Sequence, residues 1–111
     1  MTTPRPEWPN LPRERVSRDE LRRLFNQARL YHRLLHGELR AVVRDQHPAP
    51  AAARQRPGTV SQIVIYFDGV APIAEVHQYV RPDGSLGASG QPDPIRLVLN
   101  GRVYLQARQP R

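Results

Sequence analysis

The sequence predicts an α+β fold in which one long N-terminal amphipathic helix packs on a four-stranded antiparallel sheet of two hairpins. Apolar residues recur at helical spacing over residues 17–44, and β-branched and aromatic residues dominate short runs within residues 59–107. An Asp-Gly pair at 68–69 and an Asn-Gly pair at 100–101 each favour a tight hairpin turn. A helix followed by two hairpins is typical of a helix layer on one face of an antiparallel sheet.

A proline-rich arm, residues 1–16, precedes the single domain that we expect over residues 17–111. Four prolines lie within the first twelve residues, and because proline lacks a backbone donor and disfavours helix, the arm is expected to be extended. Trp8 and Leu11 are the side chains that could attach it to the domain, and a loose tail is the favoured alternative. The length of 111 residues corresponds to one domain with a core of its own.

The helix is expected to begin near Ser17, because Ser17 and Glu20 have the spacing of a capping box. Apolar residues then occupy one side of residues 17–44. Gly37 interrupts this pattern without changing its phase, which favours one continuous helix over a helix–turn–helix. Such a helix would be roughly 40 Å long, so one end should protrude from the domain or pair with another chain.

Six arginines fall on another side of this expected helix and form a basic stripe there. They are Arg18, Arg22, Arg29, Arg33, Arg40 and Arg44. The chain has a formal net charge of +7, and all 17 of its basic residues are arginine. Guanidinium groups bind phosphate or carboxylate through paired hydrogen bonds, so the stripe predicts a surface for nucleic acid or an acidic protein. A GC-rich genome also produces an all-arginine chain, and the sequence leaves both explanations open.

Residues 45–58 contain three prolines and a glycine, so they are expected to form an irregular connector before the sheet region, 59–107. If Pro72 does not shift the register of the first hairpin, the two faces of the sheet can be assigned from the alternation of side chains. The face toward the helix should carry Ile63, Ile65, Phe67, Val70, Ala74, Val76 and Val80. The opposite face should carry Gln62, Tyr66, Glu75, His77, Tyr79 and Arg81.

The candidate catalytic residues form a row on that polar face: His77, Glu75, Tyr79 and Arg81. A carboxylate or imidazole can take the proton of a ribose 2′-hydroxyl, and a second group can protonate the leaving oxygen. Arginine can stabilise the charge that develops on the phosphoryl group. The row therefore indicates metal-independent cleavage of RNA. A half-exposed antiparallel strand is also polar on its outer face without any catalysis.

The stretch from His77 to Pro94 is the densest run of turn-forming residues in the chain, and its loop runs from Arg81 to Pro94. Asp83 and Asp93 can each close a local turn through their own side chains. We expect an ordered loop that lies beside His77 and forms one wall of a site, with a mobile hairpin connection as the alternative.

No metal site and no cofactor are predicted. The chain has no cysteine, and its histidines show no established ligand spacing, because His32 and His36 lie one helical turn apart without a third ligand. No apolar run is long enough to cross a membrane, and the N-terminus lacks the apolar segment of a secretory signal. A cytoplasmic location is therefore expected.

The segment from Ile63 to Leu105 carries the motifs H-Q-Y, R-P-D-G and G-Q-P-D-P. It resembles small bacterial proteins of an uncharacterised family that share a similar pattern. The resemblance implies one domain and a bacterial origin, and it implies no activity. The expected order of a helix and antiparallel strands is also similar, at the level of the fold alone, to the RelE/BrnT class of ribonuclease toxins.

Three functional hypotheses follow from the sequence. The first is a nucleic-acid-binding accessory or regulatory protein, with RNA favoured over DNA and an acidic protein as the other partner. The second is a small ribonuclease of toxin type. The third is a non-catalytic oligomerisation or structural module, in which the long helix pairs with a second copy.

Overall fold

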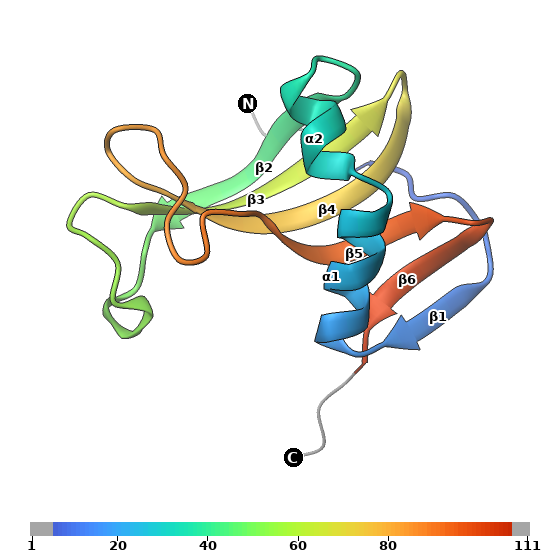
Figure 1. Ribbon diagram of the computed structural model, residues 1–111, viewed down its shortest axis with the longest axis horizontal. Coiled ribbons are helices and arrows are strands. Elements are labelled where there is room, and N and C mark those ends of the chain that lie inside the picture. Colours follow the sequence, from blue (N-terminus) through green and yellow to red (C-terminus); the bar gives the residue numbers. More distant parts are fainter. Residues whose placement is uncertain (1–5, 108–111) are drawn as a thin grey trace.

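A six-stranded mixed sheet with two short helices on one face forms the body of the protein (Figure 1). The computed structural model describes residues 6–107. The elements are β1 (Arg13–Val16), α1 (Arg18–Gln27), α2 (Leu30–Leu35), β2 (Arg40–Pro48), a 3-10 turn η1 (Ala51–Ala53), β3 (Val60–Asp68), β4 (Ala71–Val80), β5 (Asp93–Leu99) and β6 (Arg102–Gln106). The strand order is β1-β6-β5-β4-β3-β2, with β1 parallel to β6 and every other neighbouring pair antiparallel.

The prediction of one helix over residues 17–44 is wrong, although its start near Ser17 is correct. The Ser17 hydroxyl accepts a hydrogen bond from the Glu20 N–H at 3.1 Å and caps α1. Arg29 then adopts a left-handed conformation, with φ of 55°, and separates α1 from α2. Gly37 has φ of 78°, and from Arg40 the chain is extended as β2.

The prediction of a four-stranded sheet of two hairpins is also wrong, whereas the broad α+β class and an antiparallel-rich sheet are confirmed. Residues 40–48 pair along β3 from Arg40 opposite Phe67 to Pro48 opposite Val60. This ladder outweighs a weak helix propensity in a segment that contains two adjacent valines. The expected pairing of a long helix with another chain has no basis in this fold.

The predicted arm, residues 1–16, contributes β1 to the sheet edge. Residues 6–12 cross the face of the sheet that lies away from the helices (Figure 1). There the Trp8 ring lies 4.8 Å from the guanidinium carbon of Arg96, and the Val103 N–H donates to the Pro12 carbonyl at 2.9 Å. The N-terminal segment is therefore packed on the described domain by a cation–π contact and a backbone hydrogen bond.

The main core lies between the helices and the sheet. Its buried residues are Leu21, Leu24, Phe25, Leu30, Leu39, Val64, Tyr66, Ala74, Val76 and Leu97. Burial raises the pKa of the Tyr66 hydroxyl far above its usual value. Within residues 6–107, no helix is both long and apolar enough to cross a membrane.

A β-bulge at Ile73 reverses the predicted faces of β3. Phe67 pairs with Pro72, but the next pair is Tyr66 with Ala74, so one residue of β4 has no partner. A shift of one residue moves every later side chain of β3 to the other face. Tyr66 consequently lies in the main core, and Ile65 lies on the face opposite the helices, where it is still only 2% exposed.

Candidate functional site

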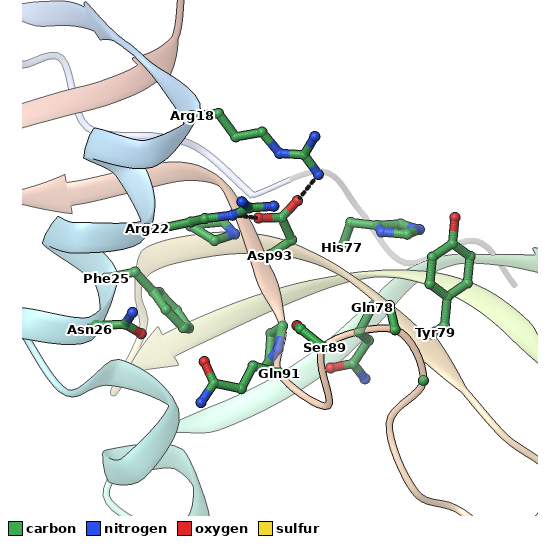
Figure 2. A pocket seen from close by; sticks show the side chains of 14 residues that line it. Arg18, Arg22, Phe25, Asn26, His77, Gln78, Tyr79, Ser89, Gln91 and Asp93 are labelled. Carbon is green, nitrogen blue, oxygen red and sulfur yellow. Dashed lines mark hydrogen bonds and ion pairs between the residues drawn. The ribbon is translucent and has the colours of Figure 1, made fainter. Parts of the chain in front are cut away.

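A cleft of about 370 Å³ lies between α1, the end of β4 and the loop before β5 (Figure 2). β5 begins at Asp93, opposite His77, so residues 78–80 lack a continuous strand neighbour on that side and have only the isolated bridge from Val80 to Leu86. The lining consists of Arg18, Arg22, Phe25, Asn26, His77, Gln78, Tyr79, Gly87, Ala88, Ser89, Gln91, Pro92, Asp93 and Pro94.

Two arginines of α1 bind one carboxylate at the rim of the cleft (Figure 2). Arg18 Nη2 donates to Asp93 Oδ2 at 2.7 Å, and Arg22 Nε donates to Asp93 Oδ1 at 2.9 Å. Burial raises the pKa of Asp93, but the hydrogen bonds from Arg22 and Arg18 outweigh this effect and hold the pKa below its usual value. Asp19 also lies 3.8 Å from Arg22 Nη1, but its side chain is 95% exposed, so Asp93 is the carboxylate that holds the two guanidiniums at the cleft.

Two aromatic rings stand on the β4 side of the same cleft. The rings of His77 and Tyr79 meet edge to face, with centroids 4.7 Å apart. The Ser61 hydroxyl lies 2.7 Å from His77 Nε2 and fixes the orientation of the imidazole. Partial burial lowers the pKa of His77, against the opposing effect of Asp93, so the ring is neutral at pH 7.

The loop from Arg81 to Pro92 makes hydrogen bonds within itself and to β4, and it forms the third wall. Asp83 Oδ1 accepts from the Ser85 N–H at 2.9 Å, which closes the turn expected from the sequence. The Gly87 N–H donates to the Tyr79 carbonyl at 2.8 Å. A Cβ at Gly87 would collide with Gln55 Oε1 and lie 3.2 Å from Tyr79 Cβ, so this close approach requires glycine.

A row of three glutamine amides crosses the sheet from the cleft to β2. Gln78 Nε2 donates to Gln62 Oε1 at 2.9 Å, and Gln62 Nε2 donates to Gln46 Oε1 at 2.7 Å. This ladder orients the Gln78 amide, which lines the cleft. The ladder uses the Nε2 donor of Gln78 and does not use its Oε1 acceptor.

A second cavity, of about 350 Å³, lies on the face of the sheet opposite the helices and is lined by Pro6, Trp8, Arg44, Glu75 and Arg96. We call it the Trp8 cavity. The Glu75 carboxylate lies between two guanidiniums, with Oε2 at 3.2 Å from Arg44 Nε and Oε1 at 3.9 Å from Arg96 Nε. The Glu75 side chain is 10% exposed, whereas those of Arg44 and Arg96 are 32% and 27% exposed.

The structure divides the predicted catalytic row between these two cavities. His77 and Tyr79 line the cleft together, and Glu75 lies on the same strand in the Trp8 cavity. Arg81 follows β4 and is in the lining of neither.

The six predicted nucleic-acid-binding arginines do not share a helix face, because the helix that would align them is not formed. Arg18 and Arg22 line the cleft, Arg29 occupies the break between the helices, and Arg33 of α2 pairs with Asp68 at 3.5 Å. The remaining two belong to β2, where Arg40 stacks on the Phe67 ring at 4.7 Å and Arg44 pairs with Glu75.

Sequence reasoning missed several residues that line or support the cleft, and it missed the partner of Trp8. Asp93 appeared as a turn former rather than as the partner of two arginines. Ser61 and Gln78 gave no signal, because their roles depend on strand register, and Gln91 gave none because it lies in the loop before β5. Trp8 was identified as an anchor of the arm, but its partner Arg96 was not.

The histidine pair on α2 is close in space, with the ring centroids of His32 and His36 4.1 Å apart. Burial lowers the pKa of His32, and the neighbouring Arg29 adds to this effect. Residues 6–107 contain no cluster of three or more potential metal-ligating side chains from His, Cys, Asp and Glu.

No family model matches the sequence, and no curated protein or solved structure matches it. The resemblance to bacterial proteins with the H-Q-Y and R-P-D-G motifs stays a prediction.

Proposed function

We propose that the protein is a nucleic-acid-binding accessory protein that binds single-stranded RNA in the cleft between α1, β4 and the loop before β5. The observation that carries this proposal is the placement of two arginine side chains opposite two partly exposed aromatic rings in one cavity. Backbone phosphates and unstacked bases require these two kinds of side chain.

Arg18 and Arg22 supply the phosphate-binding part of the cleft. Each guanidinium has five N–H donors, and each uses one of them in its short contact with Asp93. The two side chains are 55% and 45% exposed, so their other donors are accessible to a phosphate oxygen. Asp93 holds both groups in place and thereby lowers the entropy that binding would cost.

His77 and Tyr79 supply the base-binding part. Both rings are partly exposed beside the loop that closes the cleft. Stacking of a base on an aromatic side chain contributes about 1–3 kcal/mol by alanine substitution and tolerates every base.

Polar groups around the rings support RNA over DNA. Gln78, Ser89 and Gln91 line the cleft and offer both donors and acceptors. A 2′-hydroxyl is itself a donor and an acceptor, so a pocket with such groups distinguishes ribose from deoxyribose. A volume of about 370 Å³ lies within the usual range for small-ligand pockets and suits a single nucleotide rather than a duplex.

The proposal is tested with fluorescence anisotropy on labelled single-stranded RNA and DNA of one sequence, titrated over a range of salt concentrations. We expect RNA to bind more tightly, with a slope of log K against log salt of about −0.7 for each phosphate contacted. The triple variant Arg18→Gln, Arg22→Gln, Asp93→Asn removes both guanidiniums together with the carboxylate that holds them, leaves only the exposed Asp19 without its partner, and should flatten the slope.

Tyr79→Ala should weaken RNA binding by about tenfold, the loss expected for one stacked base. Arg102→Gln is the matched control, because Arg102 pairs with Glu14 at the far end of the sheet and is similarly exposed. Absence of salt-dependent RNA binding in the unaltered protein would disprove the proposal, as would an equal loss of affinity in the control.

The contact between Ser61 and His77 favours a second candidate, a metal-independent ribonuclease that uses the same cleft. With Nε2 donating to the Ser61 hydroxyl, Nδ1 of the neutral imidazole carries the lone pair of a general base. It would take the proton of a 2′-hydroxyl while the 2′-oxygen attacks phosphorus and the bond to the 5′-oxygen breaks. The Tyr79 hydroxyl would protonate that oxygen, and Arg18 and Arg22 would stabilise the phosphorane.

Cleavage is separated from binding by incubating labelled RNA with the protein in the presence of EDTA and resolving the products by length. A 2′,3′-cyclic phosphate product that disappears in His77→Ala would establish the ribonuclease. RNA that stays intact at protein concentrations that saturate binding would exclude the ribonuclease and leave the accessory role.

A further inference from the structure

The Trp8 cavity has a polar lining that the proposed RNA contacts in the cleft do not use. The Glu75 carboxylate faces this cavity from β4. The guanidiniums of Arg44, on β2, and of Arg96, on β5, flank it. Trp8 adds a flat wall, since its ring stacks on the Arg96 guanidinium. Planar walls and a carboxylate between arginines are suited to a flat heterocycle with both donors and acceptors on its edge.

Arg96, which lines the cavity, has one side-chain donor that is not used. Its Nε is buried and has no hydrogen-bond partner among the described residues, because Glu75 Oε1 is 3.9 Å away. A buried N–H without an acceptor is costly, so a ligand that supplies an acceptor there is favoured.

Among the nucleobases, guanine alone fits a carboxylate flanked by arginines. Its N1–H and exocyclic N2–H₂ lie side by side and can donate to the two oxygens of one carboxylate, while O6 and N7 accept from a guanidinium. Adenine and cytosine each present an acceptor next to their exocyclic amine. Uracil has one N–H between two carbonyls, so each of these three bases would place an acceptor against the carboxylate.

We propose that the Trp8 cavity is a guanine-specific subsite, in which Glu75 binds the N1–H and N2–H₂ edge, an arginine binds O6 or N7, and Trp8 covers one side of the base. Occupation would replace the long contact between Glu75 and Arg96 with hydrogen bonds from the base. Arg44 would keep its closer contact with the carboxylate.

The inference rests on the proposed RNA binding where the guanine belongs to a strand. Glu75 and His77 point to the same face of β4 and are two residues apart, which separates their Cα atoms by about 6.6 Å. A strand with a guanine in the Trp8 cavity can therefore place a neighbouring nucleotide in the cleft. A free guanine nucleotide presents the same edge, so the chemistry of the base defines the site in both cases.

The test uses the fluorescence of Trp8, which is the single tryptophan of the chain and reports directly on this cavity. GMP, IMP, AMP, CMP and UMP are titrated separately. We expect saturable quenching by GMP and no saturable quenching by AMP, CMP or UMP. IMP should bind at least about tenfold more weakly than GMP, because it lacks the exocyclic amine and so one hydrogen bond to a charged acceptor.

The source of the guanine is distinguished with two hexanucleotides, all-adenine RNA and the same RNA with one guanine at its third position. Tighter binding of the guanine-containing strand than of GMP identifies RNA as the source. Binding of GMP without any preference between the strands identifies a free nucleotide.

Glu75→Gln replaces one carboxylate oxygen with a donor and should weaken GMP binding by at least about tenfold. Because this variant can lose stability, Arg96→Lys is a second variant that keeps the charge but loses the paired donors, and its GMP affinity is measured by calorimetry together with its thermal unfolding. Arg102→Gln serves as the control.

Equal quenching by GMP and AMP would overturn the guanine subsite, and so would the absence of quenching by GMP and by the guanine-containing strand. The two proposals fail separately. Strong RNA binding with neither a guanine preference nor quenching by GMP overturns only the subsite, whereas guanine binding at Trp8 by a protein that does not bind RNA overturns only the proposed function.

Discussion

The two faces of the sheet differ in the groups that they bury, although the face away from the helices buries Ile65 as well as Glu75. On the face toward the helices, Phe25, Tyr66 and Leu97 belong to a continuous apolar cluster and are almost fully buried. On the opposite face, the carboxylate of Glu75 lies between two arginines beneath the N-terminal segment. The first arrangement removes apolar surface from water, whereas the second removes charges from water.

The difference separates stability from function within one small domain. Burial of apolar surface stabilises a fold by about 25 cal/mol per Å². A buried ion pair contributes little net stability, since desolvation offsets the attraction, and apolar residues of the same volume are often as good or better. The charged arrangement around Glu75 therefore calls for a reason other than stability, and a polar ligand provides one.

The largest effect should come from the apolar face. Phe25→Ala is expected to lower the free energy of unfolding by about 3–5 kcal/mol, from lost transfer energy and from the cavity that remains. The Phe25 ring is 2% exposed and packs 6.2 Å from Tyr66 between centroids. Chemical denaturation followed by circular dichroism measures the change.

Val70→Ala is the control for Phe25→Ala, because Val70 is 94% exposed in the β3–β4 turn and should change stability by less than about 0.5 kcal/mol. Similar losses in the two variants would mean that the core does not lie between the helices and the sheet.

Substitution on the charged face should lower the free energy of unfolding by less than Phe25→Ala does, and apolar replacement of the whole charged group should reverse the loss. Glu75→Gln is expected to cost about 1–3 kcal/mol, because it leaves two partly buried guanidiniums without their carboxylate. Replacing Glu75, Arg44 and Arg96 together with Leu, Leu and Met should restore the lost stability while it abolishes guanine binding. Denaturation curves and Trp8 fluorescence on the same samples measure the two effects.

A triple variant that is less stable than Glu75→Gln would contradict this comparison. The ion pairs would then stabilise the fold on their own account, and their burial would need no ligand to explain it.

Local sequence signals predicted the second half of the fold better than the first. The hairpin turn signals near residues 69 and 101 placed β3, β4, β5 and β6 in the correct order. The first turn lies at Gly69 and Val70, one residue later than predicted, so Val70 is exposed rather than on the core face. Residues 40–48 were assigned to the helix and the connector, because two valines next to arginines fit either periodicity and only pairing with β3 decides between them.

The bulge at Ile73 limited the prediction of faces. Pro72 indicated a possible irregularity, but only the ladder shows that the register shifts by one residue. The polar row of β4 was assigned to the face away from the helices. Glu75 and His77 do alternate along β4 with Ala74 and Val76, which lie in the core on the helix side. The partners of these residues come from distant segments, and no local pattern reveals Asp93 beside Arg18 or Trp8 beside Arg96.

The dependence of stability on pH distinguishes the cleft from the core. Partial burial lowers the pKa of His77 in the folded state below the usual value of about 6.5. The unfolded chain then binds more protons between these two pKa values, so stability is fully present above pH 6.5 and falls as the pH decreases toward the folded pKa. His47 and Arg18 face the imidazole and act in the same direction as burial, whereas Asp93 opposes them.

The measurement is the midpoint of thermal unfolding at pH values from 8 down to 5, for the unaltered protein and for His77→Gln. The variant should lose less stability over the acidic part of this range. His32 also has a lowered pKa and is present in both proteins, so the difference between the two curves isolates His77. Parallel curves would show that His77 titrates normally.

The smallest effect on stability, combined with a clear effect on binding, is expected for Gly87→Ala. Gly87 does not need a positive φ, so alanine adds no backbone strain and should change stability by less than about 1 kcal/mol. Its Cβ must displace the flexible Gln55 side chain and press on Tyr79, which moves the ring that the proposed RNA contact needs. RNA affinity in the anisotropy assay should fall several-fold.

The double variant Gln55→Ala, Gly87→Ala removes one of the two collisions, so part of the affinity should return. Gly69→Ala is the converse control, because its φ of 59° imposes strain in a turn away from the cleft and should lower stability without changing affinity. Full affinity in Gly87→Ala would exclude the close approach of the loop to Tyr79 from the binding site.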